Sequence, residues 1–275
     1  MIKKLSPFSG LLFFLFLISL ISAAVALFGG SVQFYLWEFP LDAKLLFYVL
    51  LLFFYIRKYH WNFGINKYGI LRWDIRSNSL AFLIPLVILA ISISMGYLFE
   101  KTTFEGVDDS VTLLLATLFD IPEVYFFSVT VILLEEWIFR GFISDFLSRQ
   151  YGLFRVVIFS SLIWTVANID KLSQFRYTSF FAISSELINL ISIGIATSVL
   201  YFQTKSIWPG YSFRVGLLVF SSTMLASNVN EMSGIFYTET QAFSNSGILL
   251  SFVTIFLSSF FFLFSKNAKE PLNFR

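Results

Sequence analysis

Two adjacent glutamates and one arginine lie within an apolar stretch, and their spacing is the clearest sign of chemistry in this sequence. Residues 124–142 carry Glu135, Glu136 and Arg140 among aromatic and aliphatic side chains. In a helix, Glu136 and Arg140 fall on one face, four residues apart, in the order that favours an ion pair. Glu135 is rotated from Glu136 by about 100°. We therefore predict that one carboxylate is held in an ion pair while the other stays available as a general base.

These three charges are costly if the stretch crosses a membrane. Each charge near the centre of a membrane helix costs about 2.5–3.5 kcal/mol, whereas each Leu, Ile, Phe or Val returns only about 0.3–0.6 kcal/mol. Three unpaired charges would cancel most of the apolar gain, so they must pair with one another or face a polar cavity. The cluster is therefore either the ionisable centre of a reaction or a set of ion pairs that joins helices.

The composition indicates a membrane protein. Of the 275 residues, 57% are hydrophobic, 13% are charged and 37 are phenylalanine, and the mean hydropathy is +0.79. Soluble globular proteins contain about 45–50% apolar and about 25% charged residues. Cysteine is absent and His60 is the single histidine, which excludes disulfides, cysteine nucleophiles and zinc sites with several His or Cys ligands. We expect an integral membrane protein that uses no metal or other cofactor and binds no nucleic acid.

Apolar runs along the chain predict an all-α fold, a polytopic membrane bundle of about eight transmembrane helices. The runs cover roughly 9–29, 43–56, 79–99, 123–143, 154–169, 179–203, 210–229 and 247–265. We expect three parts along the chain. N-terminal membrane helices with a basic loop at 57–78 occupy residues 1–110, a core occupies 111–229, and a last helix with a tail occupies 230–275.

The positions of lysine and arginine predict the orientation. With the N-terminus inside, the inner side collects Lys3, Lys4, Arg57, Lys58, Lys67, Arg72, Arg76, Arg149, Arg155, Lys205, Lys266, Lys269 and Arg275. The opposite side collects only Lys44, Lys101, Lys171 and Arg176. Cytoplasmic loops are rich in Lys and Arg, so we expect both termini in the cytoplasm and a location in a bacterial inner (plasma) membrane. Residues 1–26 imitate a cleavable signal peptide, but an apolar stretch of about 18 residues favours a retained helix.

The residues around the glutamates are similar to the first motif of a known family, the CPBP intramembrane proteases, also called the CAAX-protease and bacteriocin-processing, or Abi, family. The likeness covers EExxxRGF from Glu135 and RQYG from Arg149, and extends over roughly residues 120–220. In that family, a glutamate of this motif and a histidine on the next helix activate water, and a His-x-x-x-Asn motif helps to hold the oxyanion. The resemblance implies an intramembrane endopeptidase for prenylated CAAX-type or transmembrane peptides, with Glu135, Glu136 and Arg140 in its catalytic motif.

The next two motifs depart from the family pattern. The segment SSLIWTVAN is similar to the aromatic-x-x-x-His motif, with Trp164 as the aromatic residue, but Asn168 stands where histidine is expected. The segment TKSIWP from Thr204 resembles the Thr-Gly-Ser-Leu-Trp-Pro stretch before the third motif, whose His and Asn are replaced by Arg214 and Leu218. Asn168 cannot take up a proton, and Arg214 stays protonated. Arg214 could stabilise an oxyanion or, more simply, neutralise a buried glutamate.

Three functions are compatible with these residues. The first is a degenerate family member that has lost proteolysis and binds or scaffolds another membrane protein or membrane lipids. The second is a working glutamate-dependent intramembrane protease with altered partner residues. The third is a carrier that couples ions or protons through its glutamates. Losing one general acid–base partner costs about 10²–10⁴-fold in rate, and this favours the first function.

Overall fold

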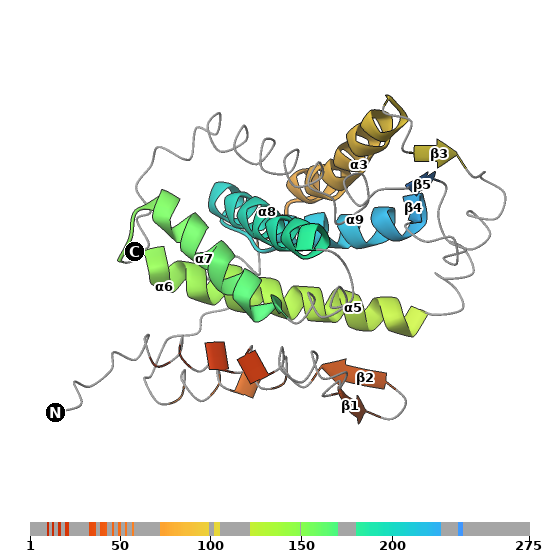
Figure 1. The fold of residues 1–275 in the computed structure, drawn as a ribbon. Coiled ribbons are helices and arrows are strands. Elements are labelled where there is room, and N and C mark those ends of the chain that lie inside the picture. Colours follow the sequence, from red (N-terminus) through yellow and green to blue (C-terminus); the bar gives the residue numbers. More distant parts are fainter. Residues whose placement is uncertain are drawn as a thin grey trace.

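The computed structural model is a set of packed helices with a few short strands (Figure 1). It describes residues 33–36, 39–42, 72–98, 102–104, 122–148, 150–169, 180–226 and 236–238, with scattered helical positions between 10 and 57. The helices are α3 (Ile75–Leu98), α5 (Pro122–Glu135), the π-helix η1 (Glu136–Ile143), α6 (Ser144–Ser148), α7 (Leu153–Ala167), α8 (Phe180–Thr204) and α9 (Trp208–Met224).

The described helices follow the predicted spans closely. The spans expected at 79–99, 154–169 and 179–203 are α3, α7 and α8, and the span expected at 123–143 is α5 together with η1. The span expected at 210–229 is α9, which ends earlier, at Met224. The spans expected at 9–29, 43–56 and 247–265 lie outside the described residues, apart from isolated helical positions in the first two. The helical fold class is therefore confirmed for the described core.

Two of these helices contain stretches that are long and apolar enough to cross a membrane. The stretches are Ile75–Met95 in α3 and Glu186–Thr204 in α8. Large apolar side chains on α3 are also exposed at helical spacing, namely Leu80, Leu83, Val87 and Ile91. An exposed apolar stripe of this kind is expected where a helix faces hydrocarbon rather than water.

The short strands form two small sheets outside the helices. The strands β1 (Gln33–Leu36) and β2 (Phe39–Asp42) pair antiparallel, with Leu36 opposite Phe39. In the second sheet, β5 (Phe236–Thr238) lies between its two neighbours, antiparallel to β3 (Thr102–Phe104) and parallel to β4 (Leu225–Ala226). These strands are not predicted from the sequence, because segments of two to four residues are too short to show an alternating pattern.

The core helices pack in pairs. α3 lies along α9, α7 lies along α8, and α8 also contacts α9 (Figure 1). The approach of α3 to α9 is close, since a Cβ atom on Gly216 would collide with the carbonyl oxygen of Phe82. One apolar cluster, around Phe139, joins η1, α7 and α8, and a second, around Leu89 and Phe213, joins α3, α8 and α9. The junction between α5 and η1 is thereby held against α7, α8 and α9.

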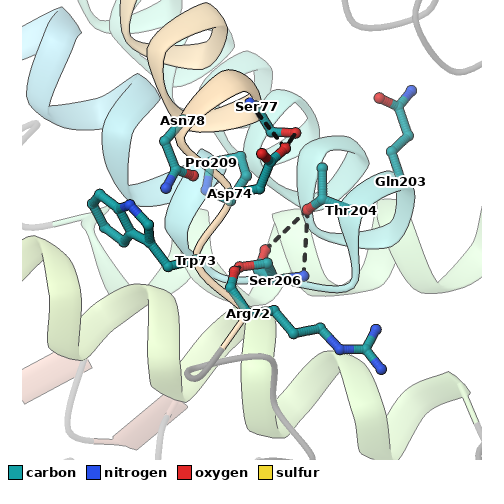
Figure 2. A pocket seen from close by; sticks show the side chains of 9 residues that line it. All are labelled: Arg72, Trp73, Asp74, Ser77, Asn78, Gln203, Thr204, Ser206 and Pro209. Carbon is teal, nitrogen blue, oxygen red and sulfur yellow. Dashed lines mark hydrogen bonds between the residues drawn. The ribbon is translucent and has the colours of Figure 1, made fainter.

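The turn between α8 and α9 is tied to the residues that precede α3 (Figure 2). The Ser206 hydroxyl donates a hydrogen bond of 2.6 Å to the carbonyl oxygen of Arg72. Lys205 directly follows the last residue of α8. Its backbone N–H donates to the Tyr201 carbonyl at 2.7 Å, and its φ is +56°. This is the single-bond, left-handed ending that glycine usually provides. Two loops that the charge bias places on the same side of the membrane are thus in contact.

Candidate functional site

The three residues of the first motif lie where α5 changes into the π-helix. Glu135 is the last residue of α5, Glu136 is the first residue of η1, and Arg140 lies in the middle of η1. All three are buried, with exposed fractions of 5%, 1% and 0%. The Ser144 hydroxyl donates to the Phe139 carbonyl at 2.9 Å, five residues back, in keeping with the wider helix. π-Helical turns are rare and often occur at functional sites.

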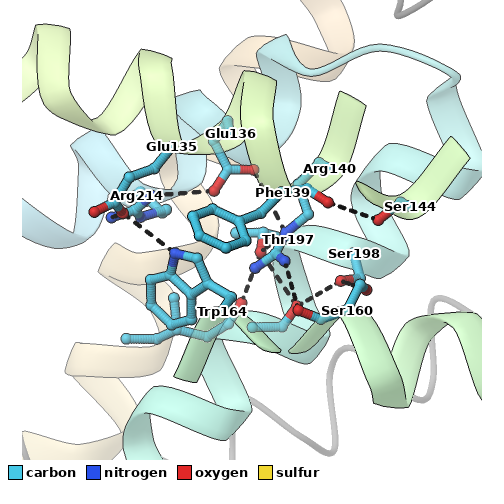
Figure 3. A network of polar contacts seen from close by, with 12 residues as sticks. Glu135, Glu136, Phe139, Arg140, Ser144, Ser160, Trp164, Thr197, Ser198 and Arg214 are labelled. Carbon is cyan, nitrogen blue, oxygen red and sulfur yellow. Dashed lines mark hydrogen bonds and ion pairs between the residues drawn. The ribbon is translucent and has the colours of Figure 1, made fainter. Parts of the chain in front are cut away.

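Arg214 of α9 reaches both glutamates (Figure 3). Its Nη2 lies 2.7 Å from Glu135 Oε2, and its Nη1 lies 3.2 Å from Glu136 Oε1. A guanidinium carries five N–H donors in a rigid fork, so it can serve two neighbouring carboxylates at once. The prediction that only one carboxylate is held in an ion pair is therefore wrong for this structure, because both are paired. Of the two roles considered for Arg214, the contacts match neutralisation of buried glutamates.

The predicted ion pair within the first motif is confirmed. Arg140 Nε lies 3.7 Å from Glu136 Oε2. Arg140 is also held by α7 and α8, since its Nε donates to Thr197 Oγ1 at 2.8 Å and its Nη1 donates to the Ser160 carbonyl at 3.4 Å. Two glutamates thus meet two arginines, and the four formal charges of this charged cluster cancel. Such compensation is what allows charges to remain in a low-dielectric interior.

Trp164 of α7 completes the charged cluster. Its indole Nε1 donates to Glu135 Oε2 at 3.2 Å. The guanidinium carbons of Arg140 and Arg214 lie 5.5 Å and 5.0 Å from the centre of its ring, within the range of cation–π attraction. From the sequence, Trp164 was identified only as the aromatic residue of a motif, and Thr197 was not singled out. A buried indole N–H needs an acceptor, and that requirement was the available signal.

Asn168 and Leu218 stand at two further positions of the family motifs and are described separately from the charged cluster. Asn168 directly follows α7 and is 1% exposed, and its Nδ2 donates to the Trp164 carbonyl at 3.0 Å. Its Oδ1 is buried and has no hydrogen-bond partner among the described residues. The side-chain amide of Asn168 therefore bonds a carbonyl in the last turn of α7. Leu218 lies four residues beyond Arg214 on α9 and is half-buried.

The first turn of α9 lies directly against the Glu136 carboxylate. A Cβ atom on Gly210 would lie 2.7 Å from Glu136 Oε2. The absence of a side chain at Gly210 therefore lets the helix that carries Arg214 approach the two glutamates. This glycine was not among the residues singled out from the sequence.

The described part of the chain contains no group of three or more His, Cys, Asp or Glu side chains that could hold a metal ion. His60 lies outside the described residues. The chemistry open to the charged cluster is therefore that of two carboxylates, two guanidinium groups and an indole, all of them paired with one another.

Comparison with known proteins relates part of the chain to a protein family. No curated protein matches the chain. Residues 117–217 match the family model described as type II CAAX prenyl endopeptidase Rce1-like, and this range holds Glu135, Glu136, Arg140, Asn168 and Arg214. It lies inside the core predicted at 111–229. Over residues 117–217 the chain thus resembles the Rce1-like, membrane-embedded family of type II CAAX prenyl endopeptidases, which confirms the resemblance predicted from its motifs.

Proposed function

We propose that this chain is a multi-pass membrane protein that keeps the fold of the CAAX endopeptidase family but does not cleave peptides. In this proposal it has about eight spans with both termini in the cytoplasm of a bacterium, and it binds or scaffolds another membrane protein or membrane lipids. Two observations support the location in a membrane. Lysine and arginine are concentrated in the loops assigned to the inner side, and α3 carries an exposed apolar stripe.

The observation that carries the loss of proteolysis is the contact of Arg214 with both glutamates, at 2.7 Å and 3.2 Å. Water activation needs a carboxylate with a lone pair directed at the water, and here Arg214 binds one oxygen of each glutamate, while Trp164 also donates to the same oxygen of Glu135. Asn168 cannot accept a proton in place of the family histidine, and its amide is bonded to its own helix. Arg214, which replaces the second histidine, thus binds the two carboxylates on which water activation would depend.

One observation favours the alternative, an active glutamate-dependent protease with altered partners. η1 begins at Glu136, and π-helical segments occur frequently at functional sites. The carrier hypothesis has no comparable support, because the two glutamates and two arginines already balance one another.

The test is reconstitution of the full chain in liposomes with prenylated CAAX-type peptides and with transmembrane peptides. The matched control is Glu135→Gln, which removes the charge but keeps an oxygen that can accept the Trp164 hydrogen bond. We expect the parent and the variant to release the same background amount of product, while an active family enzyme cleaves under the same conditions. Cleavage by the parent that is lost in Glu135→Gln would overturn the proposal and establish the protease.

A further inference from the structure

A second polar site, separate from the charged cluster, lies where the start of α3 meets the turn between α8 and α9 (Figure 2). It is a pocket of about 340 Å³, at the small end of the range usual for sites that hold small molecules. Its lining consists of Arg72, Trp73, Asp74, Ser77, Asn78, Gln203, Thr204, Ser206 and Pro209. None of the residues of the charged cluster lines it, so this pocket is a site of its own.

The walls of this pocket are fixed by contacts between its two sides. The Ser206 hydroxyl bonds the Arg72 carbonyl at 2.6 Å, and Trp73 packs edge-on against Trp208 with ring centres 4.7 Å apart. Asp74 caps α3, accepting hydrogen bonds from the backbone N–H groups of Arg76 and Ser77 at 3.3 Å and 3.1 Å. The pocket is therefore formed by the folded core itself.

Asn78 lines the pocket with a side-chain amide that has no hydrogen-bond partner among the described residues. The residue is 5% exposed, and neither its Oδ1 nor its Nδ2 has a hydrogen-bond partner among the described residues. Buried side-chain amides almost always have partners, so an amide that has none and lines a pocket points to a ligand. That ligand has to offer both a hydrogen-bond acceptor and a hydrogen-bond donor.

Opposite charges lie at two ends of the pocket. The Arg72 side chain extends away from the Asp74 carboxylate, and both are exposed (Figure 2). Within the described part of the chain, no ion pair joins these two side chains. The hydrogen bonds from Ser77 lower the pKa of the Asp74 carboxyl, so it stays anionic at neutral pH. A guanidinium and a carboxylate that are held apart suit a ligand with an anionic and a cationic end.

The position of the pocket indicates where such a ligand comes from. The apolar stretches Ile75–Met95 and Glu186–Thr204 both end at it, so it lies at the level where hydrocarbon gives way to lipid headgroups. Trp73 and Trp208 fit this position, because tryptophan is enriched at the interface between the membrane and water. We propose that the pocket binds the headgroup of a zwitterionic phospholipid with a primary ammonium group, its phosphate at Arg72, its ammonium between Asp74 and the Oδ1 of Asn78, and an ester oxygen at the Nδ2 of Asn78.

The experiment measures lipid binding to the purified full chain in detergent by native mass spectrometry. The probes are phosphatidylethanolamine, phosphatidylglycerol, which lacks the ammonium group, and free phosphoethanolamine. We expect the parent to bind phosphatidylethanolamine about tenfold more tightly than phosphatidylglycerol, because only the former can make a charge-assisted bond to Asp74. Free phosphoethanolamine should bind more weakly than the lipid, because it lacks the apolar chains.

Three variants separate the parts of the pocket. Asp74→Asn keeps the helix cap and should abolish the preference for phosphatidylethanolamine. Asn78→Leu should weaken binding without lowering the melting temperature of the lipid-free protein, because it replaces an unbonded amide by an apolar group of similar size. Arg72→Gln should weaken both lipids, whereas Arg155→Gln, at an exposed arginine predicted to face the same side, should change neither.

Equal binding of the two lipids by the parent would overturn the proposal. So would a preference for phosphatidylethanolamine that survives both Asp74→Asn and Asn78→Leu. Free phosphoethanolamine bound as tightly as the lipid would overturn the assignment to a membrane lipid. None of these measurements involves peptide cleavage, so the outcome is independent of whether the chain is a protease.

Discussion

Arg214 Nη2 lies 2.7 Å from Glu135 Oε2, although 79 residues separate the two in sequence. The same guanidinium also holds Glu136, and the indole of Trp164 donates to the Glu135 oxygen that accepts from Arg214. This relationship joins α9 to the junction of α5 and η1 through charges buried among apolar side chains.

Gly210 should not tolerate alanine. The new Cβ would lie 2.7 Å from Glu136 Oε2, so this oxygen, which also lies 3.7 Å from Arg140 Nε, would have to shift. Overpacking of a filled core typically costs about 1–3 kcal/mol, so Gly210→Ala should lower the melting temperature in detergent. Gly152→Ala is the control and should cost less, because nothing lies within 4 Å of a Cβ there. Equal melting temperatures for the two variants would show that α9 does not press on the carboxylate.

Replacing Lys205 by glycine should stabilise the protein. Lys205 has a φ of +56°, a left-handed conformation that is unfavourable for residues with a Cβ, and the resembling family has glycine at this position. Burial and the nearby charge of Arg72 also lower the pKa of its ammonium group. Lys205→Gly should therefore stabilise the protein by up to about 1 kcal/mol, as measured by unfolding in detergent micelles.

Lys205→Ala separates the backbone effect from the charge effect. Alanine removes the charge but keeps a Cβ, so it should gain less than glycine. In the parent, a pKa below the ordinary 10.5 means that the folded state binds fewer protons than the unfolded state just below that pH. Stability from this group should therefore rise as the pH increases toward 10.5, and the rise should be missing in Lys205→Gly. A gain in Lys205→Ala equal to that in Lys205→Gly would argue against backbone strain.

The loop charges predict which side of the membrane each loop faces. The natural chain has no cysteine, so single cysteines can be added without background. In intact cells, Lys4→Cys, Asn66→Cys and Ala268→Cys should be shielded from an external impermeant maleimide, whereas Val107→Cys and Thr240→Cys should be labelled. Labelling of Asn66→Cys would contradict the topology of eight spans with both termini inside.

Restoring the family residues should not simply restore an enzyme. The triple variant Asn168→His, Arg214→His and Leu218→Asn removes the guanidinium that compensates Glu135 and Glu136. Loss of one partner of a buried ion pair costs about 3–5 kcal/mol, so the variant should express poorly or melt at a lower temperature. A stable and active triple variant would instead show that only the chemistry, and not the geometry, differs from that of the family.

The helices and one ion pair could be predicted because they depend on local sequence. Apolar runs of membrane length located α3, α7 and α8 to within a few residues, and the four-residue spacing predicted the contact of Glu136 with Arg140. The π-helix could not be predicted, because the sequence was read with the ordinary helical period. The short strands had too few residues to show their own period.

The partners of the charged cluster depend on packing between helices, which one sequence does not reveal. Arg214 could be considered as a neutralising charge because buried glutamates require one. That it binds both glutamates, leaving neither carboxylate unpaired, follows from how α9 lies against the junction of α5 and η1. The contributions of Trp164, Thr197 and Gly210 likewise come from three different helices that meet there.

The central claim is that Arg214 holds the glutamates as structural ion pairs. The most direct measurement is a double-mutant cycle of Glu135→Gln and Arg214→Gln, with the free energy of unfolding of the full chain determined in detergent micelles. Each single variant should lose about 3–5 kcal/mol, with the larger loss in Arg214→Gln, because that arginine also serves Glu136. The double variant should lose less than the sum of the two, by about 1 kcal/mol or more. Additive losses, or single variants as stable as the parent, would contradict the claim.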